Sequence, residues 1–397
     1  FSNEYKTKEG DIGNGILDTF DRYNFTVKED EPLEKEVAID PEMLGKVFEN
    51  LLEVKDRKSK GTYYTPREIV HYMCEQSLLN YLSTELEGKV RKVEVENLIK
   101  YGESVIENEI HIEAKGKETK KYNYKLPESI RKNAKLIDNK LADIKVCDPA
   151  VGSGAFPVGM MAEIIKARSV LSAYIKNKNR TTYNFKRQCI QNSLYGVDID
   201  LGAVEIAKLR LWLSLIVDEE DIKTIKPLPN LDYKIVCGNS LMSIEKNLFN
   251  QQLFVKLEEL KPLFFDETNT DKKREYKKQI DEIIKKITNG HKDFDFEIYF
   301  SEVFHEKKGF DVVIANPPWV FSRLGGFTIS EKKYYSKRYV GANGKINLYS
   351  LFVNQGFMII KNKGFVTMII PNTFLRASVY EDLRRYLLSK TKIISIA

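Results

Sequence analysis

The chain has 397 residues, of which 42% are hydrophobic and 30% are charged, with 63 Lys and Arg against 57 Asp and Glu. This composition excludes disordered and collagen-like chains and predicts two or three globular domains with sizeable cores. No apolar run approaches the roughly 20 residues that span a bilayer, and the four Cys and four His show neither metal-ligand nor disulfide spacing. We therefore expect a cytoplasmic protein with no metal site and no membrane partner.

Basic residues gather in three stretches, 55–60, 272–278 and 332–338. The net charge of +6 is too small to indicate a nucleic-acid partner by itself. Each stretch alone is more typical of a solvated helix face. Because the chain begins with Phe1 and ends at Ala397 in an apolar run, we also expect it to be a piece of a longer protein.

Residues 1–140 are expected to form a mostly helical N-terminal region. Apolar residues from 40 to about 81 recur at helical spacing, and Pro66 suits the first turn of a helix. Residues 91–127 instead alternate apolar and polar side chains, as at Val93 and Val95. This alternation predicts a β-prone hairpin inserted into the helical region.

From residue 141 to 397, short apolar strands alternate with longer amphipathic helices. The expected strands are 145–147, 195–197, 234–237, 311–315 and 365–370. A run rich in Lys and Glu predicts a charged helical insertion at about 242–308. This order predicts an α/β fold, a doubly wound and mostly parallel sheet with both faces covered.

The first predicted strand runs into a glycine turn, residues 148–154 (DPAVGSG), followed by a helix. Glycines let the backbone approach a ligand closely, and open α/β sheets bind cofactors at the carboxyl ends of their strands. The spacing matches neither the dinucleotide fingerprint nor a phosphate-binding P-loop. Because the carboxylate of Asp148 would repel a pyrophosphate and attract an ammonium group, a cationic ligand is favoured. A glycine turn required only by crossover geometry remains the alternative.

Polar side chains also follow the second and third predicted strands. Asp198 ends the second strand, from which a carboxylate can accept hydrogen bonds from both hydroxyls of an adenosine ribose, whereas Asp200 suits the N-cap of the next helix. Asn239 follows the third strand, and its amide can read the edge of an adenine. Taken alone, Asn239 is more typical of a turn.

The fourth predicted strand ends in Asn316-Pro317-Pro318-Trp319. Two prolines fix a rigid turn and remove two backbone donors, which leaves carbonyl groups and the Asn316 amide oxygen to accept hydrogen bonds from an NH2 group. Trp319 would stack on a planar substrate. The alternative is a proline-rich strand exit with a core tryptophan.

In this order, and with Tyr63-Tyr64-Thr65-Pro66 upstream, the motifs resemble those of the gamma-class N6-adenine DNA methyltransferases. The resemblance is strongest to type IIG restriction-modification and related phage-defence proteins. It spans residues 40–397, and 347–352 and 364–374 are similar to later core motifs of the family. It implies a class I S-adenosylmethionine-dependent methyltransferase fold, Rossmann-like, that transfers a methyl group to a flipped adenine of double-stranded DNA.

The resemblance also implies a set of site residues. Thr65 and Pro66 would approach the methionine part of S-adenosylmethionine, Asp148 its ammonium, Asp198 its ribose and Ile199 its adenine. The whole implied cofactor set is Thr65, Pro66, Asp148, Ala150, Gly152, Gly154, Phe156, Asp198, Ile199 and Asn239. The implied catalytic set is Asn316, Pro317, Pro318 and Trp319, where the family most often has Tyr or Phe in the last position.

Other readings use the same motifs. Protein-glutamine and rRNA base methyltransferases share the Asn-Pro-Pro-aromatic tetrad, and a non-catalytic subunit that binds cofactor and DNA is a further alternative. Residues 1–39 contain no nuclease constellation, so endonuclease activity is not expected of this chain. A nuclease and a C-terminal recognition domain are expected outside it, and the DNA sequence recognised is therefore unreadable, because base-edge contacts specify a site.

Overall fold

The computed structural model describes four short strands in the first 64 residues and most of the chain from residue 65 onward. The described ranges after residue 64 are 65–115, 125–177, 179–216, 231–244, 251–267, 269–288, 294–320, 327–343 and 346–397. Residues 39–64 lie outside the described residues, and they include the basic stretch 55–60, Tyr63, Tyr64 and the first part of the helical segment expected from 40 to about 81. The last part of that segment is helical, in α4 (Arg67–Glu85). The four early strands form two pairs, antiparallel β1 (Glu4–Lys6) with β2 (Ile12–Asn14) and parallel β3 (Asn24–Thr26) with β4 (Glu36–Ala38).

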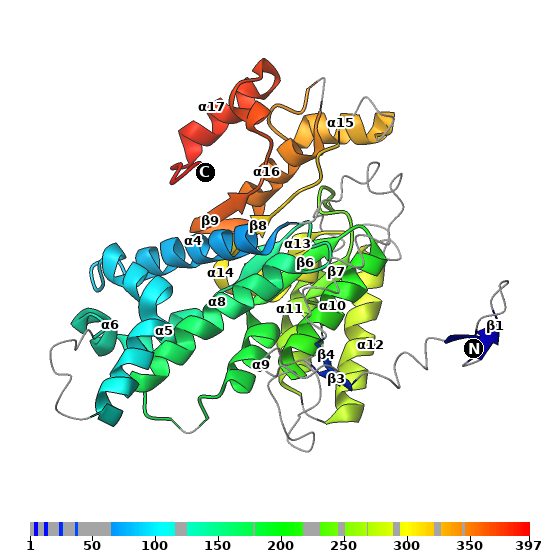
Figure 1. Cartoon of the computed structure of the whole chain (residues 1–397). Helices are drawn as coiled ribbons and strands as arrows, with labels where there is room; N and C mark the ends of the chain where they lie inside the picture. The colour runs from blue at the N-terminus through cyan, green and yellow to red at the C-terminus, as the bar shows by residue number, and fades with distance from the viewer. Residues whose placement is uncertain are drawn as a thin grey trace.

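Five parallel strands form the central sheet in the order β7-β6-β5-β8-β9 (Figure 1). They are β5 (Val146–Asp148), β6 (Leu194–Asp198), β7 (Ile235–Cys237), β8 (Phe310–Ala315) and β9 (Ile360–Met368). β5, the first of these five strands in the chain, lies in the centre of the sheet. β6 and β7 are added on one side of it, and β8 and β9 on the other. The place between β5 and β8 where the strand order reverses is the topological switch point at which open α/β sheets bind ligands. The predicted doubly wound fold is confirmed.

Alternate strand residues face two different helical layers, because successive side chains of a strand point to opposite faces. Val146 and Ile314 belong to one buried cluster, and Cys147 and Val313 to the other. The first layer contains α4 (Arg67–Glu85), α5 (Lys92–Lys115), α6 (Glu128–Lys132), α7 (Ala134–Asp143), α8 (Ala155–Leu171), α9 (Thr182–Asn192) and α10 (Leu201–Ile216). The second contains α11 (Gln251–Asp266), α12 (Thr270–Ile287), α13 (Phe296–Tyr299) and α14 (Ser301–Lys307).

The remaining helices lie near the carboxyl end of β8 and after β9. They are α15 (Ile329–Arg338), α16 (Leu348–Ile359) and α17 (Glu381–Lys390), with the short 3-10 turns η5 (Asn372–Leu375) and η6 (Ser378–Tyr380). A further 3-10 turn, η2 (Ser172–Tyr174), directly follows α8. α16 packs closely on the sheet at Gly356, where a Cβ atom would lie 2.8 Å from Met368. Among the residues that the structure describes, no helix combines the length and the apolar character that crossing a membrane requires.

The β-prone hairpin predicted at 91–127 is wrong for most of that range, because α5 occupies Lys92–Lys115, while 116–124 lie outside the described residues. Val93 is 66% exposed, whereas Val95 is buried, so their alternation reflects the two sides of a helix. Leu98 and Val105 continue the buried side at helical spacing and join the cluster shared with α4 and α8. Tertiary packing of this stripe outweighs the local β-branched pattern.

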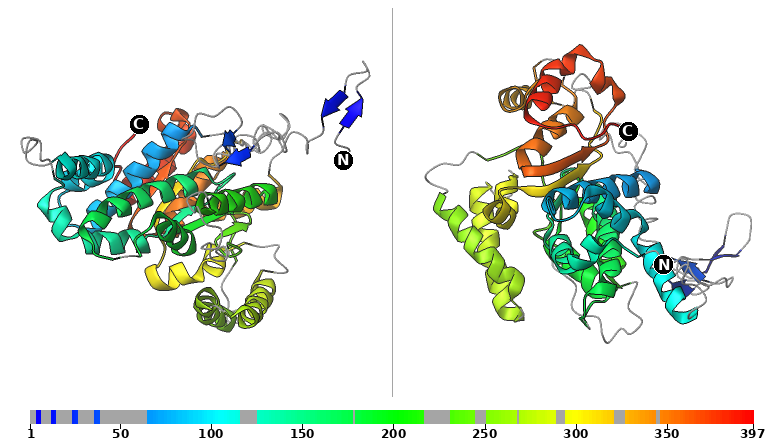
Figure 2. Two further views of the ribbon diagram at one scale, coloured as in Figure 1. Left: turned by 60° about the horizontal axis from the view of Figure 1, so that its bottom comes forward. Right: turned by 90° about the vertical axis from the view of Figure 1, so that its left-hand side faces the viewer.

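The charged helical insertion predicted at about 242–308 contains α11 and α12, which stand away from α4, α8 and α9 (Figure 2). Asn269 caps α12, since its side chain accepts hydrogen bonds from the N–H groups of Asp271 and Lys272. The proposed division of the chain at about residue 140 remains a prediction. In the structure, residues of α4 and α5 share one buried cluster with α8 and β5.

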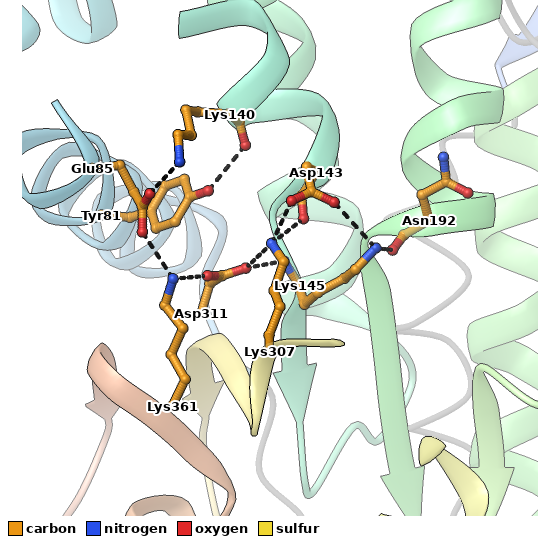
Figure 3. Close-up of polar contacts among 9 residues, drawn as sticks. All are labelled: Tyr81, Glu85, Lys140, Asp143, Lys145, Asn192, Lys307, Asp311 and Lys361. Atoms are coloured by element: carbon orange, nitrogen blue, oxygen red, sulfur yellow. Dashed lines mark hydrogen bonds and ion pairs between the residues drawn. The ribbon is translucent and has the colours of Figure 1, made fainter. Parts of the chain in front are cut away.

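α4 runs beside the sheet and is held at its C-terminal end by a network of charges (Figure 3). The Glu85 carboxylate accepts hydrogen bonds from Lys140 at 2.6 Å and Lys361 at 2.8 Å. Lys361, in β9, also pairs with the fully buried Asp311 of β8, which accepts the backbone N–H of Lys145 at 2.7 Å. The network fixes the C-terminal end of α4 beside the first residues of β8 and β9. Because a helix is rigid, its N-terminal end is then placed near the carboxyl ends of these strands.

Candidate functional site

The glycine turn leaves β5 at the carboxyl edge of the sheet. Asp148 is the last residue of β5, and its Oδ1 accepts the N–H of Ala150 at 2.9 Å. Gly152 and Gly154 have φ values of +50° and +87°, in the region that favours glycine. A Cβ atom at Gly154 would lie 3.0 Å from the Cβ of Ala207 in α10, whereas one at Gly152 would meet nothing within 4 Å. Gly154 therefore serves helix packing, and Gly152 borders open space.

Asp198 ends β6 and binds the glycine turn directly. Its Oδ2 accepts the N–H of Gly152, and its Oδ1 accepts the N–H of Asp200, both at 2.9 Å. Asp200 caps α10, since its Oδ1 accepts the N–H of Ala203 at 3.2 Å. The helix-capping role expected for Asp200 is thus confirmed. Asp198 does not cap the helix and lies at the end of β6, beside the glycine turn.

The two strand-end carboxylates lie in an environment that disfavours their negative charge. Burial raises the pKa of Asp148 well above its usual range, and the negative charge of Asp198 raises it further. Burial also raises the pKa of Asp198, against the lowering effect of the N–H groups of Asp200 and Gly152. A cationic group bound beside them would compensate this cost. The two carboxylates therefore favour a cationic ligand at this edge of the sheet, and Gly152 leaves room beside them.

The loop after β7 is tied to the glycine turn and to α15. Asn239 Oδ1 accepts the N–H of Leu241 at 3.0 Å, so the turn role left open for this residue is present. Ser240 donates its hydroxyl to the carbonyl of Pro149 at 2.5 Å, and Tyr339 donates to the carbonyl of Leu241 at 2.8 Å. Sequence reasoning missed Ser240 and Tyr339; Ser240 is adjacent to a motif residue, but nothing in the local pattern marks Tyr339.

Asn316 follows β8 and contacts the start of α4. Its Nδ2 donates a hydrogen bond to Thr65 Oγ1 at 3.1 Å, which joins two motifs far apart in the sequence. Pro66 occupies the N-cap position of α4, without a side-chain hydrogen bond. Trp319 is 38% exposed, so the alternative of a core tryptophan is wrong. Ile199 is 69% exposed, while Phe156 is buried in the first core cluster.

The structure thus brings most of the implied residues to one edge of the sheet. Contacts link the glycine turn with Asp198, Pro149 with the β7 loop, and Asn316 with Thr65. Phe156 differs, because its side chain packs in the core below the turn. The edge combines the buried carboxylate of Asp148, the half-buried carboxylate of Asp198, an amide after a rigid proline turn, and exposed apolar side chains.

A scan of protein-family models matches residues 192–397, just over half of the chain, to the Eco57I restriction-modification methylase. The chain belongs to this family. The matched segment contains Asp198, Asn239 and Asn316–Trp319. The family and the sheet topology together identify a class I methyltransferase fold and the gamma-class resemblance is confirmed.

Three curated relatives extend this finding. A putative type II restriction enzyme and methyltransferase of Methanocaldococcus jannaschii is 26% identical and aligns with 97% of this chain and 38% of its own length. The type II restriction enzyme and methyltransferase Eco57I of Escherichia coli is 24% identical over 67% of this chain and 23% of its own length. The adenine-specific methyltransferase BrxX of Escherichia coli is 22% identical over 64% of this chain and 23% of its own. The chain therefore spans well under half of each relative.

Solved structures similar to this chain include two protein–DNA complexes. The type IIL enzyme MmeI in complex with DNA matches 89% of this chain and 36% of its own, with a TM-score of 0.44 and 14% identity. The DrdV–DNA complex matches 88% of this chain and 24% of its own, with a TM-score of 0.42 and 14% identity.

Proposed function

We propose that this chain is the catalytic part of a site-specific DNA methyltransferase that methylates N6 of a flipped adenine, within a restriction-modification or phage-defence system. The observation that carries the proposal is the place of Asn316, directly after β8, at the edge where Asp148 ends β5 and Asp198 ends β6. Membership of the restriction-modification methylase family and a relative named as adenine-specific support it.

The proposed cofactor is S-adenosylmethionine, which when bound supplies an electrophilic methyl group on its sulfonium centre. Asp148 would bind the ammonium, and the Gly152 turn would border the ligand. Asp198, whose two oxygens already accept backbone N–H groups, would accept the ribose hydroxyls with its remaining lone pairs. Ile199 and the loop at Asn239 would hold the adenine, and the N-terminus of α4 after Pro66 favours the cofactor carboxylate.

The target amine would be held by the exit of β8. Asn316 Oδ1 and the Pro317 carbonyl would each accept one N–H of the adenine amino group. Two such bonds favour the pyramidal geometry in which the nitrogen lone pair is free to react. Trp319, with its ring partly exposed, would stack on the flipped base and offset part of the few kcal/mol that flipping costs. Positioning and electrostatics would dominate the catalysis.

α15 provides a basic surface next to the loop after β7. Lys332, Lys333 and Lys337 are exposed on it, and Tyr339 at its C-terminal end is bonded to the β7 loop. Phosphate groups of DNA bind such lysines with little dependence on base sequence. A nuclease and a recognition domain are proposed to lie outside this chain.

The test is to express the intact protein in a methylation-free bacterial host and to sequence the host DNA for N6-methyladenine. A single modified motif that is absent with Asn316→Ala supports the proposal. DNA that stays unmodified in the presence of soluble, cofactor-binding protein contradicts it and shifts the substrate to RNA or protein.

A further inference from the structure

The amide of Asn316 has two chemically different ends, and only one of them can hold a target amine. Oδ1 accepts hydrogen bonds and Nδ2 donates them, so a rotation of the amide by half a turn would present N–H groups to an NH2 substrate. Such a donor–donor contact is repulsive. The direction of this amide therefore decides whether Asn316 attracts or rejects the substrate.

The structure gives the Nδ2 end a partner from another part of the chain. Asn316 Nδ2 donates to Thr65 Oγ1 at 3.1 Å, and Thr65 is only 8% exposed. Thr65 directly precedes Pro66, whose carbonyl accepts the N–H groups of Ile69 and Val70, both at 3.1 Å, as the first turn of α4 forms. The acceptor is thus attached to the start of a regular helix.

α4 is held against the core along its length, so Thr65 has little freedom. Near its start, a Cβ atom at Gly159 of α8 would lie 2.5 Å from Val70, which shows how closely the two helices approach. In its middle, Ser77 Oγ lies 2.9 Å from Thr367 Oγ1 of β9. At its end, Glu85 pairs with Lys361 of the same strand (Figure 3).

We propose that Thr65 is a positioning residue for the transfer reaction. Its hydroxyl accepts the Nδ2 hydrogen bond and fixes the position of the Asn316 side chain, in the arrangement where Oδ1 is the amide end directed to the target amino group. This role rests on the proposed function, and it is distinct from the contact with the methionine part of the cofactor that the family resemblance implies for Thr65. α4 then fixes the position of Thr65, because its other end is held by the charge network at Glu85.

Two substitutions separate the hydroxyl from the shape of the side chain. Thr65→Val keeps the volume and removes the acceptor, whereas Thr65→Ser keeps the acceptor. The intact protein is mixed with DNA from a methylation-free host at saturating S-adenosylmethionine, and the single-turnover rate is measured. We expect Thr65→Val to be slower by about tenfold and Thr65→Ser to stay within about twofold, the size expected for one hydrogen bond.

Saturation separates the two roles of Thr65. A Thr65→Val rate that equals the wild-type rate once cofactor is saturating overturns the inference, because the residue then acts through cofactor affinity alone. A slow rate that Thr65→Ser does not share supports it.

A second measurement does not depend on methyl transfer. In protein labelled with 15N at asparagine, the side-chain NH2 signals of Asn316 are identified by their loss in Asn316→Ala. We expect them to shift in Thr65→Val and to stay close to the wild-type positions in Thr65→Ser. Unchanged signals in Thr65→Val overturn the inference whether or not the wild type methylates DNA. A wild type that modifies no DNA overturns the proposed function instead, so the two failures are distinguishable.

Discussion

The backbone N–H of Gly152 donates a hydrogen bond to Oδ2 of Asp198 at 2.9 Å, across 46 residues of sequence. The ends of β5 and β6 are therefore one structural unit, in which a carboxylate proposed to hold a ribose also shapes the glycine turn. A substitution at Asp198 is expected to act on both.

Asp198→Ala is expected to weaken S-adenosylmethionine binding by roughly 1 to 3 kcal/mol, the usual effect of losing a charge-assisted hydrogen bond. It should also lower the free energy of unfolding, because the N–H groups of Gly152 and Asp200 lose their acceptor. Asp198→Asn keeps one acceptor oxygen but loses the charge. It should therefore lower the free energy of unfolding less than Asp198→Ala does, while still weakening cofactor binding. Titration calorimetry and denaturant unfolding measure the two effects, and unchanged affinity in Asp198→Ala would assign the ribose role to another residue.

Asn316→Ala is expected to reduce methyl transfer at least about 100-fold, since it removes a preorganised group aimed at the reacting centre. Cofactor affinity should change little, because this side chain is proposed to act on the target amine and not on the cofactor. The exposed Asn177, between α8 and α9, provides the control Asn177→Ala, which should leave both quantities unchanged. Parallel loss of cofactor binding in Asn316→Ala would argue against its assignment to the target.

Asp148 predicts an unusual pH dependence of stability. Because burial raises its pKa in the folded protein, the folded state binds more protons than the unfolded state above the ordinary carboxyl pKa of about 3.9. This contribution to stability is full below that pH and is lost as the pH rises through the folded pKa. Asp148→Asn should therefore gain stability relative to the cofactor-free wild type as pH rises, measured by urea unfolding from about pH 5 to 8. A difference that is constant across pH would refute the raised pKa.

The lysines of α15 are expected to contribute to DNA affinity, whereas those of α12 are not. The test variant replaces three exposed lysines with Gln: Lys332, Lys333 and Lys337. The matched control replaces three exposed lysines of α12: Lys272, Lys278 and Lys285. The α15 variant should bind DNA more weakly, with a slope against log salt smaller by up to about 0.9 per lost phosphate contact. Equal losses in both variants would indicate a general charge effect in place of a docking surface.

Much of the fold was predictable because strands and turns leave local signals. The glycine turn and the proline turn mark two strand ends, and the parallel order follows from the alternation with helices. The helix α5 was not predictable from the local pattern, because Val93 and Val95 alternate with polar residues as in a strand. The buried side of this helix, which includes Leu98, is recognisable only from its packing against α4 and α8. β9 begins at Ile360, and not at 365, because Ile360 already pairs with Phe310 of β8, ahead of an irregularity in the register that a local pattern does not reveal.

The same reasoning applies to the site. Asp148, Asp198 and Asn316 could be found from their places after strands. The bond between Asn316 and Thr65 could not, because it depends on how α4 lies across the sheet.

The buried cluster that α4 and α5 share with α8 has a practical consequence for dissecting this protein. Cys74, Leu78 and Val95 are fully buried on the N-terminal side of residue 140, and Met160 and Ile164 on the other. A cut between them would expose two complementary apolar surfaces to water. The two pieces are expected to be poorly soluble alone and to reassociate when co-expressed, as halves of one folding unit. A truncation that removes α4 and α5 would thus take away part of the hydrophobic core together with Thr65.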